Sequence, residues 1–319
     1  MRRSRPGRQP MPGPLRAELA ALEEALSAQV APRSGDDNLL VATWNTRDLD
    51  AYADEWIPRL ADAPGRDRFS IECIAAILRR FDLVALSGVD AAGDAFGAIL
   101  ELLGPERYGT LVSSPGRRAA PGDGPGAAFV YDKSRLTASG LACEIVSLPG
   151  DPIPWGAFIE QFDRAPYAAS FHRCGSPLVV VRCELARRER PRREIEHLEK
   201  IAKWFSGWAR DEARVGPSLH RVGDVEAVRG DEHAAEAFAR VGLELAGASL
   251  PGDGAARFAW FTAPGRGARL RFEPKRSGAF DFSRTLCADE GADAVARRIA
   301  PAPPRWLELE RRRDGLNLS

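Results

Sequence analysis

Three oxygen-bearing side chains stand where apolar runs of the sequence end. Asn45 ends one such run, and Asp224 and Glu226 follow another. Open α/β folds place functional residues at strand ends, and carboxylate and amide oxygens suit Mg²⁺, Mn²⁺ or Ca²⁺. Because Asp and Asn are also frequent turn residues, these three predict a metal site only where the fold brings them together.

No other local pattern in the sequence predicts catalysis. The chain contains no GxxxxGK[ST] phosphate loop, no GxGxxG turn, no GxSxG elbow and no HExxH motif. Its cysteines include no CxxC pair, which argues against a zinc site or a disulfide framework. The histidines show no pair at metal-ligand spacing; they are His172, His197, His220 and His233.

The composition is balanced in charge. The chain has 45 Lys and Arg against 45 Asp and Glu, a formal net charge of 0. This balance argues against a dedicated nucleic-acid or membrane binder, which usually has a strong basic surplus. No stretch reaches the roughly 20 apolar residues that span a bilayer, and the basic N-terminus lacks the apolar segment of a secretory signal. We expect a cytoplasmic protein without membrane contact.

The sequence predicts one domain between two short tails. Residues 1–37 are expected to form a disordered basic tail, a short amphipathic helix and a linker. Strand-like and helix-like runs then alternate over residues 38–310, and residues 311–319 form a C-terminal tail. This mixture favours a two-sheet α/β sandwich over a doubly wound parallel sheet.

Apolar periodicity locates the individual elements. A hairpin is expected around the turn Cys174–Pro177. Helices are predicted over residues 69–81, 95–103, 192–210 and 232–241. Strands are predicted over residues 39–44, 82–86, 127–131, 141–148, 167–171, 178–185, 218–222 and 305–310.

Segments spread over residues 38–310 resemble, in order, the endonuclease/exonuclease/phosphatase superfamily, which has the deoxyribonuclease I-like fold. The resemblance implies a four-layered α/β/β/α sandwich with two sheets. It is carried by LLVATWNTRDLD, FSIECIAAILRRFDLVALSGVD, GAAFVYDKSRL, FDRAPYAASF, PLVVVRCEL with RREIEHLEKIAKWF behind it, HRVGDVEA, and the closing RSGAFDF and APAPPRWLEL.

The resemblance also implies a phosphoesterase site. Such enzymes cleave phosphodiesters or phosphomonoesters: a Glu and an Asn/Asp set hold Mg²⁺, and an Asp–His pair activates the attacking water. Onto this chain the resemblance carries Asn45, as a metal- and phosphate-contacting residue, Asp224 of the Gly-Asp-x-Asn motif, and Arg164 of the Arg-x-Pro segment.

Other positions of the family site carry different residues here. The metal-binding Glu falls on Gly88, the central-strand His on Glu184, and the Asn of Gly-Asp-x-Asn on Glu226. A further Asp falls on Ala259, and the closing Ser-Asp-His falls on residues 300–302, which read Ala-Pro-Ala. General acid/base catalysis alone raises the rate of such a reaction by about 10²–10⁴-fold, so loss of these residues removes most of the catalytic power. We therefore expect a catalytically impaired pseudoenzyme that keeps the fold as a binding or scaffold module and requires no cofactor.

Two alternatives stay open. One is an active Mg²⁺- or Mn²⁺-dependent phosphodiesterase or phosphatase with a rebuilt acidic site, since strand alternation places Asp90 on the same face as Gly88. The other is an arginine-based binder of nucleic acid or another phosphate-containing ligand. The rebuilt site would comprise Asn45, Asp90, Glu184, Asp224 and Glu226, and the binding surface Arg164, Arg182, Arg221 and residues 187–193.

Overall fold

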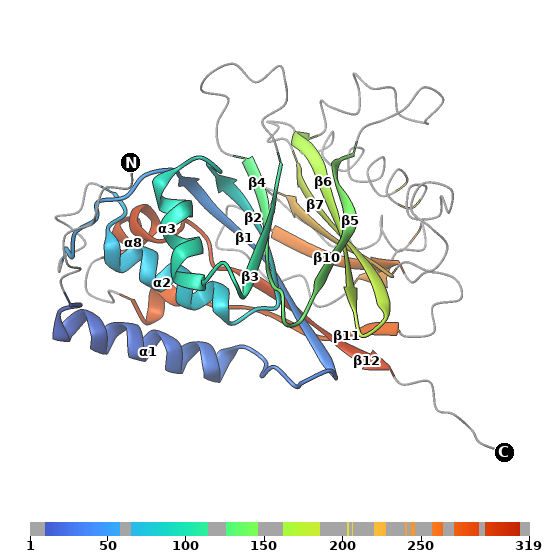
Figure 1. Ribbon diagram of the computed structural model, residues 1–319, viewed down its shortest axis with the longest axis horizontal. Coiled ribbons are helices and arrows are strands. Elements are labelled where there is room, and N and C mark those ends of the chain that lie inside the picture. Colours follow the sequence, from blue (N-terminus) through green and yellow to red (C-terminus); the bar gives the residue numbers. More distant parts are fainter. Residues whose placement is uncertain are drawn as a thin grey trace.

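The computed structural model contains two six-stranded sheets packed face to face, with helices over the outer face of the first sheet (Figure 1). This is the predicted two-sheet α/β architecture. The described residues are 10–57, 65–113, 126–145, 162–185, 203, 206, 220–227, 240, 244–245, 257–263, 271–286 and 291–312.

The first sheet brings the two ends of the domain together. Its strand order is β11-β12-β1-β2-β4-β3. The early strand β1 lies between β12, to which it is antiparallel, and β2, to which it is parallel. The strands are β1 Asn38–Leu49, β2 Leu83–Val89, β3 Tyr108–Val112, β4 Gly126–Asp132, β11 Arg271–Ala279 and β12 Arg305–Arg312.

The second sheet has the order β5-β6-β7-β8-β10-β9. It contains the predicted hairpin β6–β7, and its two central strands, β7 and β8, run parallel. The strands are β5 Thr137–Glu144, β6 Phe162–Arg173, β7 Ser176–Leu185, β8 His220–Ala227, β9 Glu244–Leu245 and β10 Arg257–Ala263.

Helices gather on one face of the first sheet (Figure 1). Alternation along β1 turns Leu40, Ala42 and Trp44 toward this layer, where they share one core with buried side chains of the helices. Leu22 of the first helix is fully buried in that core. The helices are α1 Gly13–Gln29, α2 Arg68–Arg79, α3 Asp94–Leu103 and α8 Ala292–Arg298, with a short 3-10 helix at Phe282–Arg284.

The other face of the first sheet packs against the second sheet. Leu39 and Val41 of β1 belong to this inter-sheet core, together with Phe129 of β4 and Tyr167 of β6. The rings of Phe129 and Tyr167 stack with centroids 5.4 Å apart. From Leu39 to Trp44, alternation along β1 therefore turns the even-numbered residues toward the helices and Leu39 and Val41 toward the second sheet.

The ends of several elements differ from the predictions. β1 extends to Leu49 instead of stopping near Trp44, and β8 runs through Asp224 and Glu226 to Ala227. Side-chain polarity ended the predicted strands, whereas backbone pairing continues past the polar residues. The helices predicted over 192–210 and 232–241 lie outside the described residues apart from positions 203, 206 and 240, which are helical.

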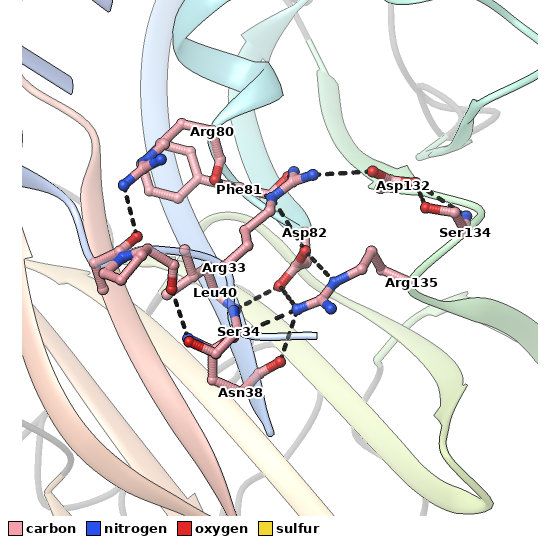
Figure 2. A network of polar contacts seen from close by, with 12 residues as sticks. Arg33, Ser34, Asn38, Leu40, Arg80, Phe81, Asp82, Asp132, Ser134 and Arg135 are labelled. Carbon is pink, nitrogen blue, oxygen red and sulfur yellow. Dashed lines mark hydrogen bonds and ion pairs between the residues drawn. The ribbon is translucent and has the colours of Figure 1, made fainter. Parts of the chain in front are cut away.

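The connector between α1 and β1, residues 30–37, is fastened to the domain by a polar network (Figure 2). Arg33 bridges two fully buried carboxylates: its Nη1 donates to Asp132 Oδ2 at 3.0 Å, and its Nε lies 3.3 Å from Asp82 Oδ1. Arg135 Nε donates to Asp82 Oδ1 at 2.8 Å. Arg33 of the connector and Arg135 of the β4–β5 turn thus converge on two acids: Asp82, which directly precedes β2, and the last residue of β4, Asp132.

Acid should weaken this network. Burial acts to raise the pKa of the Asp132 carboxyl, but hydrogen bonds from Ser134 and Arg107 outweigh it and hold the pKa below its ordinary value. A carboxyl with a lowered folded-state pKa stabilises the fold above its unfolded pKa of about 3.9, and that stability disappears as the pH falls through the folded value. Urea titrations should show that the free energy of unfolding decreases once the pH is lowered past about 4. Asp132→Asn should be less stable than the wild type at neutral pH and should lose less stability on acidification. An unchanged acid decline in Asp132→Asn would contradict this assignment.

Two other findings bear on the sequence predictions. Cys73, Cys143 and Cys174, the cysteines for which a state is described, are free. Within the described ranges, none of the helices has the length and apolar character needed to cross a bilayer.

Candidate functional site

The inter-sheet core becomes polar toward the carboxyl ends of three strands. Along β1, β2 and β7, the alternation that buries apolar side chains between the sheets leads on to Asn45, Ser87 and Arg182, with Thr43 before Asn45 on β1. We call Asn45, Ser87 and Arg182 the polar end of the core. Arg182 is 3% exposed and Ser87 2% exposed. The Arg182 side chain reaches from β7 to β2, where its Nη2 donates a hydrogen bond to Ser87 Oγ at 3.0 Å.

Strand pairing places two predicted site residues at this level. The Phe129–Tyr167 stack shows that β4 faces β6, and the Arg182–Ser87 bond shows that β2 faces β7. The neighbouring strands β1 and β8 therefore face each other. Asn45 pairs in register with Ser87, and Asp224 with Arg182. The backbone thus brings Asn45 and Asp224 to one level of facing strands, as the metal-site prediction requires.

Three further candidates of the second sheet form a row two residues further along β7 and β8, while Arg221 lies near the start of β8, paired in register with Val179. Backbone register pairs Arg164 of β6 with Glu184 of β7, and Glu184 with Glu226 of β8. Register shifts flank Arg164 on both sides, so the pairing of β6 with β7 is irregular there. Three sequence-predicted residues from three strands are therefore neighbours in one row of the backbone.

Gly88, at the expected position of the metal-binding Glu, lies under a distortion of β1. The β1–β2 register shifts between Asn45 and Leu49, and Arg47 has a left-handed φ of 43°. Gly88 has φ 76°, and a Cβ atom built on it would lie 2.5 Å from the backbone nitrogen of Arg47. Backbone therefore occupies the space into which any side chain at position 88 would project.

The distorted segment of β1 is held by one arginine. Arg66 Nη2 donates to the carbonyl oxygens of Thr46, of Arg47 at 2.6 Å and of Ile299 at 3.3 Å. The Asn45 side chain takes part in the same segment, because its Oδ1 accepts a hydrogen bond from the Arg47 backbone N–H at 3.1 Å. The Asn45 amide oxygen, which was expected to contact a metal, thus accepts a hydrogen bond within its own segment of β1.

The loop at residues 299–302 closes this side of the site. Trp44 Nε1 donates to the Ala302 carbonyl oxygen at 2.9 Å, so the loop lies beside the carboxyl end of β1. Arg298, just before the loop, is anchored by Asp67: Nη2 and Oδ2 are 2.6 Å apart, and both side chains are almost completely buried. The position of the family Ser-Asp-His is therefore well anchored but offers only alanine and proline side chains.

Asp90 does not continue the strand face of Gly88. β2 ends at Val89, and its pairing with β4 shifts between Ser87 and Val89. Asp90 is exposed, and its Oδ1 accepts a hydrogen bond from the Ala92 backbone N–H at 3.0 Å. The alternation argument that linked Asp90 to the site fails at the irregularity of Gly88, and the described contact is that of a turn residue.

The described side chains at this level of the first sheet do not fit a divalent cation. On the first-sheet side, β2 supplies a glycine and a serine, and the Asn45 oxygen is engaged by Arg47 N–H. Within the described part of the chain, no three His, Cys, Asp or Glu residues are grouped as a metal cage requires. Of the acidic candidates, Glu184, Asp224 and Glu226 are placed by backbone register alone.

Sequence reasoning missed Ser87 and Arg66, and it treated Arg182 as a surface residue. Ser87 and Arg182 carry a readable signal, because each is the next polar residue on a strand face of period two. Arg66 carries none, since a loop arginine that binds backbone carbonyls looks like any other loop arginine. Residues 187–193, the basic run of the arginine-binder hypothesis, lie outside the described residues.

Comparison with known proteins identifies the fold. No protein-family model matches the chain, and no curated protein matches it. Among solved structures, an endonuclease/exonuclease/phosphatase from Bacteroides vulgatus is similar with a TM-score of 0.54 and 14% identity over 86% of this chain and 98% of that one. A mannosyl-6-phosphatase from Bacteroides thetaiotaomicron gives a TM-score of 0.52 and 13% identity over 86% and 99%. The D. rerio TDP2 complex with a single-strand DNA product gives 0.51 and 14% over 86% and 100%. The chain therefore has the fold of the endonuclease/exonuclease/phosphatase proteins, as the resemblance implied.

Proposed function

We propose that this protein uses an endonuclease/exonuclease/phosphatase fold for binding and does not hydrolyse phosphate esters. The observation that carries the proposal is the contact between Gly88 and the backbone of Arg47, because a Cβ at position 88 would lie 2.5 Å from the Arg47 nitrogen. Because backbone occupies the space at position 88, a carboxylate at this position cannot be supplied from β2.

Proton transfer lacks its family residue as well. Glu184 stands at the position of the central-strand His, and Ala302 at the position of the closing His. Each positioned acid or base of this kind is worth about 10²–10⁴-fold in rate. The described side chains at the polar end of the core do not replace that function, because an arginine and a serine cannot deliver a proton to a leaving group at neutral pH.

The experiment is a hydrolysis assay on the purified chain. We expect no turnover of p-nitrophenyl phosphate, bis-p-nitrophenyl phosphate, or single- and double-stranded DNA above the enzyme-free rate, with either Mg²⁺ or Mn²⁺. Asp224→Ala should behave as the wild type does. Turnover that Asp224→Ala abolishes would overturn the proposal.

One observation favours a second candidate, the active hydrolase with a rebuilt acidic site. The register of β6, β7 and β8 supports it, because Arg164, Glu184 and Glu226 are neighbours in one row. In this candidate the two carboxylates take over metal binding, with Mg²⁺ or Mn²⁺ as the ion. The same assay separates the candidates if Glu184→Gln and Glu226→Gln are included, since only the hydrolase predicts turnover that both substitutions reduce.

A further inference from the structure

The polar end of the core contains a buried positive charge that no part of the family pattern accounts for. Arg182 comes from the second sheet, yet its Nη2 lies 3.0 Å from Ser87 Oγ in the first sheet. Both side chains are at least nine-tenths buried. An arginine is ionised at all ordinary pH values, so the two sheets enclose a permanent cation at this level.

The cation lies among the residues to which the resemblance assigns metal binding. Ser87 pairs in register with Asn45, and Arg182 pairs in register with Asp224. A buried charge is stable only with compensating charge or hydrogen bonds. The Ser87 hydroxyl supplies a hydrogen bond acceptor, and the register partner Asp224 is an acid of opposite charge.

A guanidinium and a divalent cation cannot share this place. Like charges at short separation in a weakly screened interior repel strongly. A carboxylate from position 88 of β2 could offset that repulsion, but the Arg47 backbone occupies the space that such a side chain would need. The backbone at Gly88 therefore removes a metal ligand on the first-sheet side, and the charge of Arg182 repels a metal ion from the space between the sheets.

We propose that Arg182 is the resident cation of this site and replaces the divalent metal ion that the family pattern implies. Its charge is opposite to that of Asp224, the acidic residue retained from that pattern and its register partner, and its hydrogen bond to Ser87 joins the two sheets. The protein is thereby independent of divalent cations. This inference deepens the proposed function and rests on it.

The test measures metal response instead of activity. The melting temperature of the wild-type chain should be the same in EDTA and in excess Mg²⁺, Mn²⁺ or Ca²⁺. Arg182→Gln should melt lower in EDTA and regain several degrees with Mg²⁺ or Mn²⁺, because an ion that binds only the folded state stabilises it. Adding Asp224→Asn to Arg182→Gln should abolish the regain.

Two matched variants separate charge from packing. Arg182→Lys keeps the positive charge and should stay insensitive to metal, and Ser87→Ala removes the hydrogen bond but keeps the cation, so it should also be insensitive. Arg182→Gln without any metal response would overturn the assignment, as would a metal response in Arg182→Lys.

A measurement on the wild type keeps the proposal testable if Arg182→Gln does not fold. Calorimetric titration of the full chain should show no Mn²⁺ or Mg²⁺ binding with a Kd below about 1 mM, the weak end for protein cation sites. Binding without hydrolysis would overturn the resident cation and leave the proposed function intact. Hydrolysis in the assay above would overturn the proposed function itself.

Discussion

Gly88→Ala should lower the free energy of unfolding by about 3–5 kcal/mol, a large effect for the addition of one methyl group. Two costs add up. The backbone at position 88 has φ 76°, a conformation that L-residues with a side chain adopt at a cost of about 1–3 kcal/mol. The new Cβ would also lie 2.5 Å from the Arg47 nitrogen and 2.7 Å from its Cα, and backbone cannot rotate away as a side chain can.

Gly97→Ala is the matched control for this prediction. Gly97 is exposed within α3, and a Cβ on it would meet no atom within 4 Å. Because alanine favours a helix interior over glycine by about 0.5–1 kcal/mol, the control should be neutral or slightly stabilised. Urea unfolding of both variants measures the difference. Equal stability of Gly88→Ala and the wild type would show that the distortion of β1 is absent in solution.

Gly88→Glu extends the same argument to activity. If the site had lost only a side chain, restoring the glutamate would restore metal binding and some turnover. Since the Arg47 backbone occupies that space, we expect Gly88→Glu to be at least as destabilised as Gly88→Ala and to show no phosphatase or nuclease activity. Any gain of turnover in Gly88→Glu would mean that the Arg47 segment of β1 moves to make room for the new side chain.

The second large effect is expected at Asp82. Asp82→Asn should lower the free energy of unfolding by about 3 kcal/mol, because removal of one partner leaves buried charge uncompensated. The Asp82 carboxylate is completely buried and accepts from Leu40 N–H at 2.8 Å and from Arg135 Nε at 2.8 Å, with Arg33 Nε at 3.3 Å. The network in Figure 2 would lose the group on which the connector and β1 converge.

Asp36→Asn makes the same chemical change at an exposed position. Asp36 is 68% exposed and lies 3.4 Å from Arg173 Nη2, and the buried Arg173 keeps its hydrogen bonds to the carbonyl oxygens of Arg135 and Gly35, so the loss of the Asp36 charge should cost less than about 1 kcal/mol. Chemical denaturation of the pair isolates the effect of burial from that of charge. Similar losses in the two variants would show that the Asp82 network contributes no more than a surface ion pair.

Periodicity was sufficient to predict the architecture. The order of strand-like and helix-like runs over residues 38–310 predicts two sheets with helices, as the structure has them. The apolar run Leu39–Trp44 does not show which of its residues face the helices and which face the second sheet. A period of two, followed from Val180 to Arg182, places Arg182 inside the sandwich, whereas its charge favours a surface position.

Other features depend on contacts that one segment cannot encode. The distortion at Gly88 requires two register shifts and a left-handed Arg47, and no local pattern predicts a shift in a partner strand. The polar composition of the connector predicts a solvated linker. Its Arg33 nevertheless contacts Asp82 and Asp132, which lie 49 and 99 residues further along the chain. Long-range pairing of this kind outweighs composition.

The position of β12 has a consequence for how the chain is made. β1 pairs with β12 from Asn38 to Thr43, and β12 is the last described strand. During synthesis, one edge of β1 therefore remains unpaired until residues 305–312 have left the ribosome. Unpaired strand edges and pairings between distant segments slow folding and promote association of incomplete chains. The yield of this protein in a cell should therefore depend on chaperones that protect the nascent chain.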